Sequence, residues 1–154
     1  MTKPLQPAFL AYLSADVANV TGDGTAYQLG TAPDALTELF DRGNDFNTNG
    51  TFTAPVTGLY QFNLGIKAEG VGAETQGFIQ VITTARAYRN PQVSPLACKT
   101  AGNELGLALS VLADMTAGDT ATASITFVGG ALTTGVGGAA ATTLITYFSG
   151  YLVC

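Results

Sequence analysis

The stretch that decides the fold is GTFTAPVTGLYQF, residues 50–62. Its first part, Gly50–Ala54, has the β-branched and aromatic residues that are typical of a strand. Pro55 ends that strand, because a proline nitrogen cannot donate a hydrogen bond to a neighbouring strand. A few residues later, Tyr60 and Phe62 begin a regular alternation of large apolar residues with polar ones. The stretch therefore predicts two β-strands joined by a tight connection.

Alternation with a period of two is the mark of a strand that buries one face, and it recurs along much of the chain. The segments that show it are Phe9–Leu13, Tyr60–Ile66, Leu105–Val111 and Thr120–Val128. Phe78–Tyr88 is a less regular strand candidate, and Leu144–Val153 is apolar on both faces, like a central strand. About eight to ten short segments with turn residues between them predict an all-β sandwich.

Two segments depart from this pattern. Ala32–Phe40 has the composition to form one or two helical turns. Gly129–Thr143 is rich in Gly, Ala and Thr and has too few large side chains to pack a core of its own. We interpret it as a long hairpin connection between the last two strands, ordered only if something packs on it.

The composition favours a soluble protein with few charged residues that associates with itself. At 154 residues the chain fits one domain, and it is 47% apolar but only 11% charged. About a quarter of the residues of an average soluble domain are charged, so a monomer would expose an unusually neutral surface. Burial between subunits would relieve this exposure.

Charge and hydropathy exclude several partners. The six basic residues are scattered, and the net charge is −5, so we expect neither nucleic acid nor an anionic membrane surface as a partner. No segment approaches the run of about 20 apolar residues that spans a membrane, so we expect no membrane insertion. Residues 1–7 contain two prolines and no apolar core of signal-peptide length, so we expect no standard export signal.

The chain contains no histidine, which excludes Ser-His and Cys-His nucleophile systems and the usual zinc sites. Its carboxylates fall mostly at turns, where they bond to their own backbone, so we expect no enzyme and no catalytic residue. A carboxylate-dependent hydrolase is the enzymatic alternative. We expect no cofactor and no metal, although residues 41–49 hold the oxygen ligands that calcium takes. Cys98 and Cys154 are expected to be unpaired thiols, with a disulfide as the alternative.

Several segments, taken in order, resemble one known family. They are Ala8–Ala11, Asn44–Phe46, residues 50–62, Leu112–Thr120 with its Ala-Gly-Asp turn, and YFSGYL at 147–152. Together they resemble the globular heads of the complement C1q family, a relative of the tumour necrosis factor fold. The signature of that family joins a Gly-x-Phe strand, an Ala-Pro turn and a Gly-x-Tyr-x-Phe strand, and its last strand reads Phe-Ser-Gly-aromatic-Leu.

The resemblance implies a ten-stranded antiparallel jelly-roll β-sandwich over residues 8–154, assembled as a homotrimer with one sheet facing the three-fold axis. Tyr60, Tyr147 and Tyr151 are its candidates for the trimer interface, and each could equally be an ordinary core residue with its hydroxyl at the rim. Residues 1–7 are expected to form an N-terminal segment that anchors the chain on a neighbouring protein or contacts another subunit.

Compared with the animal members, this sequence has no collagen segment, no histidine and few lysines. By analogy we expect a bacteriophage or other viral version, located on the virion surface as a fibre, tail or capsid decoration. It would be a non-enzymatic structural or recognition head that binds a receptor, a host glycan or another virion protein. Tyr27, Phe46 and Tyr88 are the candidate ligand-binding residues, as aromatic rings on the loop side. The alternative is an adhesion or ligand-binding module on a bacterial surface or outside the cell.

Overall fold

The computed structural model describes residues 6–153, and residues 1–5 and 154 lie outside the described part. The described residues form thirteen strands and one short helix. In chain order these are β1 (Ala8–Tyr12), β2 (Val17–Thr21), β3 (Ala26–Gln28), β4 (Thr37–Arg42), β5 (Phe46–Asn47), β6 (Thr51–Thr53), β7 (Gly58–Glu69), β8 (Gln76–Thr83), β9 (Ala87–Arg89), α1 (Pro95–Cys98), β10 (Leu105–Met115), β11 (Thr120–Val128), β12 (Thr134–Val136) and β13 (Tyr147–Val153).

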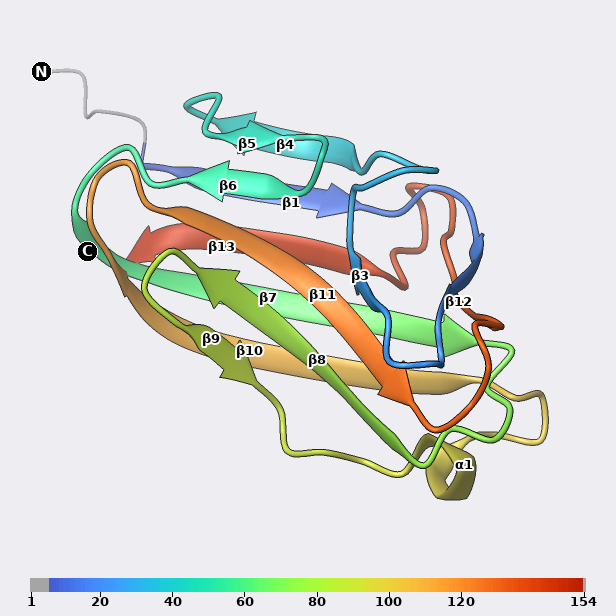
Figure 1. The fold of residues 1–154 in the computed structure, drawn as a ribbon. Helices are drawn as coiled ribbons and strands as arrows, with labels where there is room; N and C mark the ends of the chain where they lie inside the picture. The colour runs from blue at the N-terminus through green and yellow to red at the C-terminus, as the bar shows by residue number, and fades with distance from the viewer. Residues whose placement is uncertain (1–5, 154) are drawn as a thin grey trace, which may run out of the picture.

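The strands pair antiparallel in two sheets that pack face to face (Figure 1). Sheet A runs β2-β12-β7-β13-β1-β4, with β10 on the opposite side of β7, and sheet B runs β5-β6-β11-β8-β9, with β3 beside β11. One open edge of the sandwich lies between β9 and β10, and the other lies at β4, β5 and β6 (Figure 1). This is the predicted all-β jelly-roll sandwich.

The described residues form thirteen strands rather than the predicted ten, and several of these strands are only two or three residues long. The turn-rich stretch after β1 forms β2 and β3, and the Gly-rich segment 129–143 contains β12. Ala32–Phe40 forms no helix, and its last residues enter β4. The only helix of the described residues is α1, a single turn in the proline-rich loop before β10.

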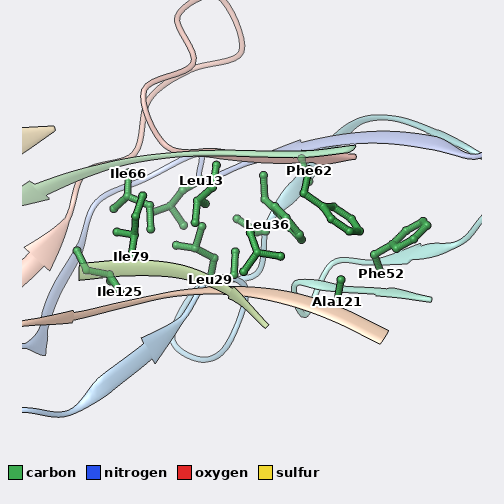
Figure 2. Close-up of a cluster of buried hydrophobic side chains, with 14 of the residues drawn as sticks. Leu13, Leu29, Leu36, Phe52, Phe62, Ile66, Ile79, Ala121 and Ile125 are labelled. Carbon is green, nitrogen blue, oxygen red and sulfur yellow. The ribbon is translucent and has the colours of Figure 1, made fainter. Parts of the chain in front are cut away.

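The two sheets enclose one apolar core, and Figure 2 shows side chains from both sheets meeting in it. At one end of the core the aromatic rings form a contiguous cluster. The ring of Phe9 stacks on Phe46 at 4.4 Å and on Phe52 at 5.1 Å, and Phe52 lies 5.4 Å from Tyr60. Such stacked and tilted pairs add to the free energy gained from burial, so residues 50–62 form the centre of the fold as well as its sequence signature.

β12 is held in place by contacts with other segments of its own chain. Its three residues are buried between β2 and the end of β7. Thr134 Oγ1 donates a hydrogen bond of 2.8 Å to Oε1 of the fully buried Glu74, whose Oε2 accepts one of 2.6 Å from the Gly72 nitrogen. The Gly-rich segment is therefore held by a strand and a buried carboxylate of its own subunit.

Gly150 lies in β13 at a point where the backbone touches two core rings. A Cβ atom there would lie 2.6 Å from Cδ1 of Phe62 and 2.8 Å from Cε1 of Phe9. We expect Gly150→Ala to lower the free energy of unfolding by about 1–3 kcal/mol, because overpacking a filled core forces side chains or backbone to shift. The measurement is equilibrium unfolding in urea.

The matched control is Gly102→Ala, in the loop before β10 and away from the outer face of sheet A, where the nearest atom to a Cβ would be Thr100 Oγ1 at 3.7 Å. Replacing an unstrained glycine with alanine raises stability, because the unfolded chain becomes less flexible. The two substitutions should therefore change stability in opposite directions. Equal effects would contradict the close approach at Gly150.

Candidate functional site

The outer face of sheet A is the surface that points away from the core. Five strands lie side by side there in the order β4, β1, β13, β7 and β10. The cross-strand register and the alternation of side chains place on this face Phe40 and Arg42 of β4, Ala8 and Leu10 of β1, Tyr147, Ser149, Tyr151 and Val153 of β13, Leu59, Gln61, Asn63, Gly65 and Lys67 of β7, and Gly106, Ala108, Ser110, Leu112 and Asp114 of β10.

Large apolar side chains are exposed on this face. Leu112 is 51% exposed and Tyr151 is 45% exposed. Phe40, Leu59 and Val153 are also exposed. A contiguous set of exposed apolar side chains on one face marks an interaction surface, whereas single exposed residues need no explanation.

The middle of the outer face is uncharged. Gln61 Nε2 donates to Ser110 Oγ at 2.8 Å, and Ser110 Oγ donates to Asn63 Oδ1 at 2.9 Å. The Tyr147 ring lies flat over Gly65, where a Cβ atom would be 2.7 Å from Cε1 of the ring. The centre of the outer face therefore needs no counter-charge from a partner.

Charged groups of the outer face lie at its two ends. Lys67 Nζ lies 2.8 Å from a carboxylate oxygen of Glu69 and 2.8 Å from one of Glu104. These two carboxylates raise the pKa of Lys67 well above its usual range. At the other end lie Arg42 and Asp114, on the two outermost strands.

The three tyrosines predicted for a trimer interface do not lie together. Tyr147 and Tyr151 lie on the outer face of sheet A. Tyr60 is fully buried in the core of its own chain, and its hydroxyl donates to the Val56 carbonyl at 2.7 Å. Burial raises the pKa of Tyr60 above its ordinary value. The interface assignment for Tyr60 is therefore corrected to a core role.

The predicted ligand-binding aromatics are not outward rings on one surface. Phe46 is buried against Phe9, and Tyr27 is buried with a hydroxyl that has no hydrogen-bond partner among the described residues. Burial, and then the charge of Asp34, raise the pKa of Tyr27. Tyr88 is half-buried, and its hydroxyl lies 3.3 Å from Asp114 Oδ1. Tyr27 and Phe46 are thus corrected to core residues.

The oxygen-rich loop 41–49 uses its side chains to fix its own backbone. The two carboxylate oxygens of Asp41 accept hydrogen bonds from the nitrogens of Asp45, at 3.3 Å, and Phe46, at 3.0 Å. Among the described residues, no group of three or more acidic, cysteine or histidine side chains is arranged to hold a metal ion.

A polar groove of about 650 Å³ lies beside this loop, at the open edge formed by β4, β5 and β6. Its lining includes Glu38, Asp45, Asn47, Asn49, Thr51 and Thr53. The run of Asn and Asp residues from 41 to 49 was visible in the sequence. What it did not reveal is that Glu38 and the threonines of β6 meet that run across the edge of the sandwich.

Cys98 is exposed and forms no disulfide within the described residues, while Cys154 lies outside them, so their pairing stays a prediction. No helix among residues 6–153 is both long and apolar enough to cross a membrane.

No family model matches the sequence, and no curated protein matches it. Among solved structures, the chain is similar to the globular domain of zebrafish complement 1qA protein, with a TM-score of 0.60 and 20% identity over 97% of this chain and 98% of that one. It is also similar to murine APRIL, with a TM-score of 0.60 and 9% identity over 96% and 99% of the two chains. Eiger TNF from S. frugiperda gives a TM-score of 0.60 at 9% identity over 99% and 94%. The chain therefore has the jelly-roll fold of the C1q and TNF globular domains.

Proposed function

We propose that this protein is a non-enzymatic, homotrimeric head on the surface of a virus particle, where it decorates the particle or binds a receptor, a glycan or a neighbouring virion protein. The observation that carries the proposal is the outer face of sheet A, which is neutral at its centre and exposes Leu112, Tyr151 and Phe40. Exposed apolar side chains gathered on one face are typical of a surface that another protein covers.

The covering surface is the open edge of a second copy. Along that edge β10 presents Leu105, Leu107, Leu109 and Val111, which pack against the core but stay half-exposed. The outer face of sheet A and the edge at β10 are different surfaces of one chain. The edge of each copy can therefore pack on the outer face of the next copy. Head-to-tail contacts close into a ring when the rotation between neighbouring copies adds up to a full turn, and the ring implied by the resemblance to C1q heads has three members.

A depression on the outer face can receive side chains from the edge of the second copy. It has a volume of about 260 Å³ and lies between Phe40, Arg42 and Tyr151, with Gln6 and Ala8 at its side. The side-chain amide of Gln6 donates to the Leu152 carbonyl, and the Leu152 nitrogen donates to the Pro7 carbonyl at 3.0 Å. The start of the described chain thus runs along β13 beside the face, a position consistent with the anchoring or inter-subunit role that we propose for residues 1–7.

The non-enzymatic part of the proposal is supported by what the carboxylates do. Asp119 Oδ2 accepts a hydrogen bond of 2.8 Å from the Thr116 nitrogen, and Asp16 Oδ1 accepts one of 2.9 Å from the Gly138 nitrogen. Asp23 Oδ1 accepts a hydrogen bond of 2.9 Å from the Thr25 nitrogen. Hydrogen bonds from the Thr25 side chain and then from its backbone lower the pKa of Asp23. Asp23 and Asp119 thus stabilise their own turns, which is a common structural use of aspartate, and Asp16 joins two distant segments of the chain.

The location is tested by labelling with gold-conjugated antibodies raised against the folded chain. We expect gold on the outside of intact, purified virus particles from a culture that produces the protein. Gold on the bacterial envelope, with bare particles, would favour the alternative of a bacterial surface module. Antibody pre-absorbed with the purified chain provides the control for non-specific labelling.

A further inference from the structure

The two open edges of the sandwich differ in character. The edge at β9 and β10 combines the partly buried apolar side chains of β10 with a salt bridge, in which Arg86 Nη2 lies 3.2 Å from Asp114 Oδ2. The edge at β4, β5 and β6 holds the polar groove. Its volume of about 650 Å³ is within the range of small-ligand sites. In the trimer that we propose, the edge at β10 contacts a second copy, so the edge at β4, β5 and β6 remains free to bind a ligand.

Two asparagines in the groove are fixed as hydrogen-bond donors. Asn47 Oδ1 accepts a hydrogen bond of 3.0 Å from the Asn49 nitrogen, and Asn49 Oδ1 accepts one of 3.1 Å from the Thr51 nitrogen. With its oxygen held by the backbone, each side chain turns its NH₂ group away from the turn. The groove therefore presents amide donors whose direction is set before any ligand arrives.

The groove also contains a carboxylate that lacks a donor. The Asp45 carboxylate receives no hydrogen bond within the described residues, and burial and then the charge of Asp41 raise its pKa. Asp41 already uses both of its oxygens on backbone nitrogens of the loop. Glu38 of β4 adds a second carboxylate to the groove. None of the groove's lining residues is a lysine or arginine.

Below these polar groups the groove has a rigid floor. Phe46 lies in the lining but is buried, and its ring stacks on Phe9 at 4.4 Å with the planes 12° apart. β5, which carries Phe46 and Asn47, pairs with β6. Asn47 lies in this strand pair, Asn49 lies in the tight turn that joins the two strands, and Asp45 directly precedes β5. Their backbone positions are therefore constrained before a ligand binds, which reduces the entropy lost on binding.

We propose that this groove binds a neutral glycan, whose hydroxyl groups donate to the carboxylates of Asp45 and Glu38 and accept from the amides of Asn47 and Asn49. This inference rests on the proposed function, since it names the ligand class of the head. A hydroxyl group both donates and accepts, so a neutral saccharide satisfies both kinds of group at once. An anionic ligand is disfavoured because it would face the two carboxylates with no cation beside them.

The test is a printed array of neutral and sialylated oligosaccharides, followed by saturation-transfer NMR with the strongest neutral oligosaccharide on the full chain. We expect binding to neutral oligosaccharides and weaker binding to their sialylated forms. Asn49→Asp keeps the oxygen that caps the turn but removes the NH₂ donor, and it should weaken binding by about tenfold. Asp45→Asn replaces one of the two acceptor oxygens with an NH₂ donor and removes the negative charge, and it should weaken binding to a similar degree.

The design separates the hydrogen bonds from net charge, because the two variants change charge in opposite directions. Asn103→Asp, in the loop before β10, adds the same negative charge away from the groove and should bind like the natural chain. Asp45→Asn should not lower the free energy of unfolding at neutral pH, because the fold disfavours the charged form of Asp45.

An array with no neutral oligosaccharide bound, stronger binding to the sialylated forms, or unchanged affinity in Asn49→Asp would each overturn the glycan site. The oligomeric mass is measured on the same samples. A trimer that binds no neutral glycan would overturn this inference alone, whereas a monomer would overturn the proposed assembly.

Discussion

Replacing Phe62 with alanine is expected to lower the free energy of unfolding by about 3–5 kcal/mol, the largest loss for any single change considered. The Phe62 side chain is fully buried at the centre of the aromatic cluster. Its ring lies 5.7 Å from those of Phe52 and Phe148. Removing it deletes contacts with both sheets and leaves a cavity that the surrounding strands cannot fill. Urea unfolding at one fixed chain concentration measures the loss, since the stability of an oligomer depends on concentration.

Phe78→Ala is the matched control for this loss. Phe78 belongs to β8, is only partly buried, and lies under the guanidinium of Arg89, 4.2 Å from the ring centre. We expect a loss of about 1 kcal/mol, mainly the cation–π contact and partial burial. Equal losses for the two variants would mean that the aromatic cluster is not the centre of stability.

Leu112→Asp is expected to convert the proposed trimer to monomers without unfolding the chain. Leu112 is 51% exposed on the outer face of sheet A, in cross-strand register with Gln61, so an aspartate there is solvated in the monomer. In an assembly the same carboxylate would be buried without a partner, at a cost of several kcal/mol per subunit. Size-exclusion chromatography with light scattering should show the mass of one chain, with an unchanged circular dichroism spectrum.

Leu132→Asp provides the control for this experiment. Leu132 is 43% exposed, but it lies in the loop between β11 and β12, away from the outer face of sheet A. The Leu132→Asp variant should stay trimeric. If Leu112→Asp also remained trimeric, the assembly would use another surface.

The fold could be predicted from the sequence because its decisive signals are local. Each signal depends only on residues that are close together in the sequence. The signals are the alternation in β7, the end of a strand at Pro55 and the glycine at position 150. The alternation in β7 also indicated that Tyr60 points into the core. Tyr60 lies two positions from the core residue Phe62 in the same strand, so both side chains face the same side of the sheet. In β13, Tyr147 and Tyr151 lie an odd number of positions from the buried Phe148, so their side chains lie on the outer face.

What the sequence could not reveal depends on contacts between distant segments. Tyr27 and Phe46 are buried by their neighbours in the fold, although each lies in a turn-rich part of the sequence. β2 pairs with β12 more than a hundred positions away, which orders the Gly-rich segment. The outer face and the groove arise in the same way, since several strands must be in register before their side chains form a surface.

Sedimentation equilibrium on the full chain at micromolar concentration tests the central claim of a trimer most directly. The account predicts a single species with three times the 15.7 kDa mass of one chain, stable on dilution. A species of 15.7 kDa across the same range would contradict it, because the outer face of sheet A would then be stable in water uncovered.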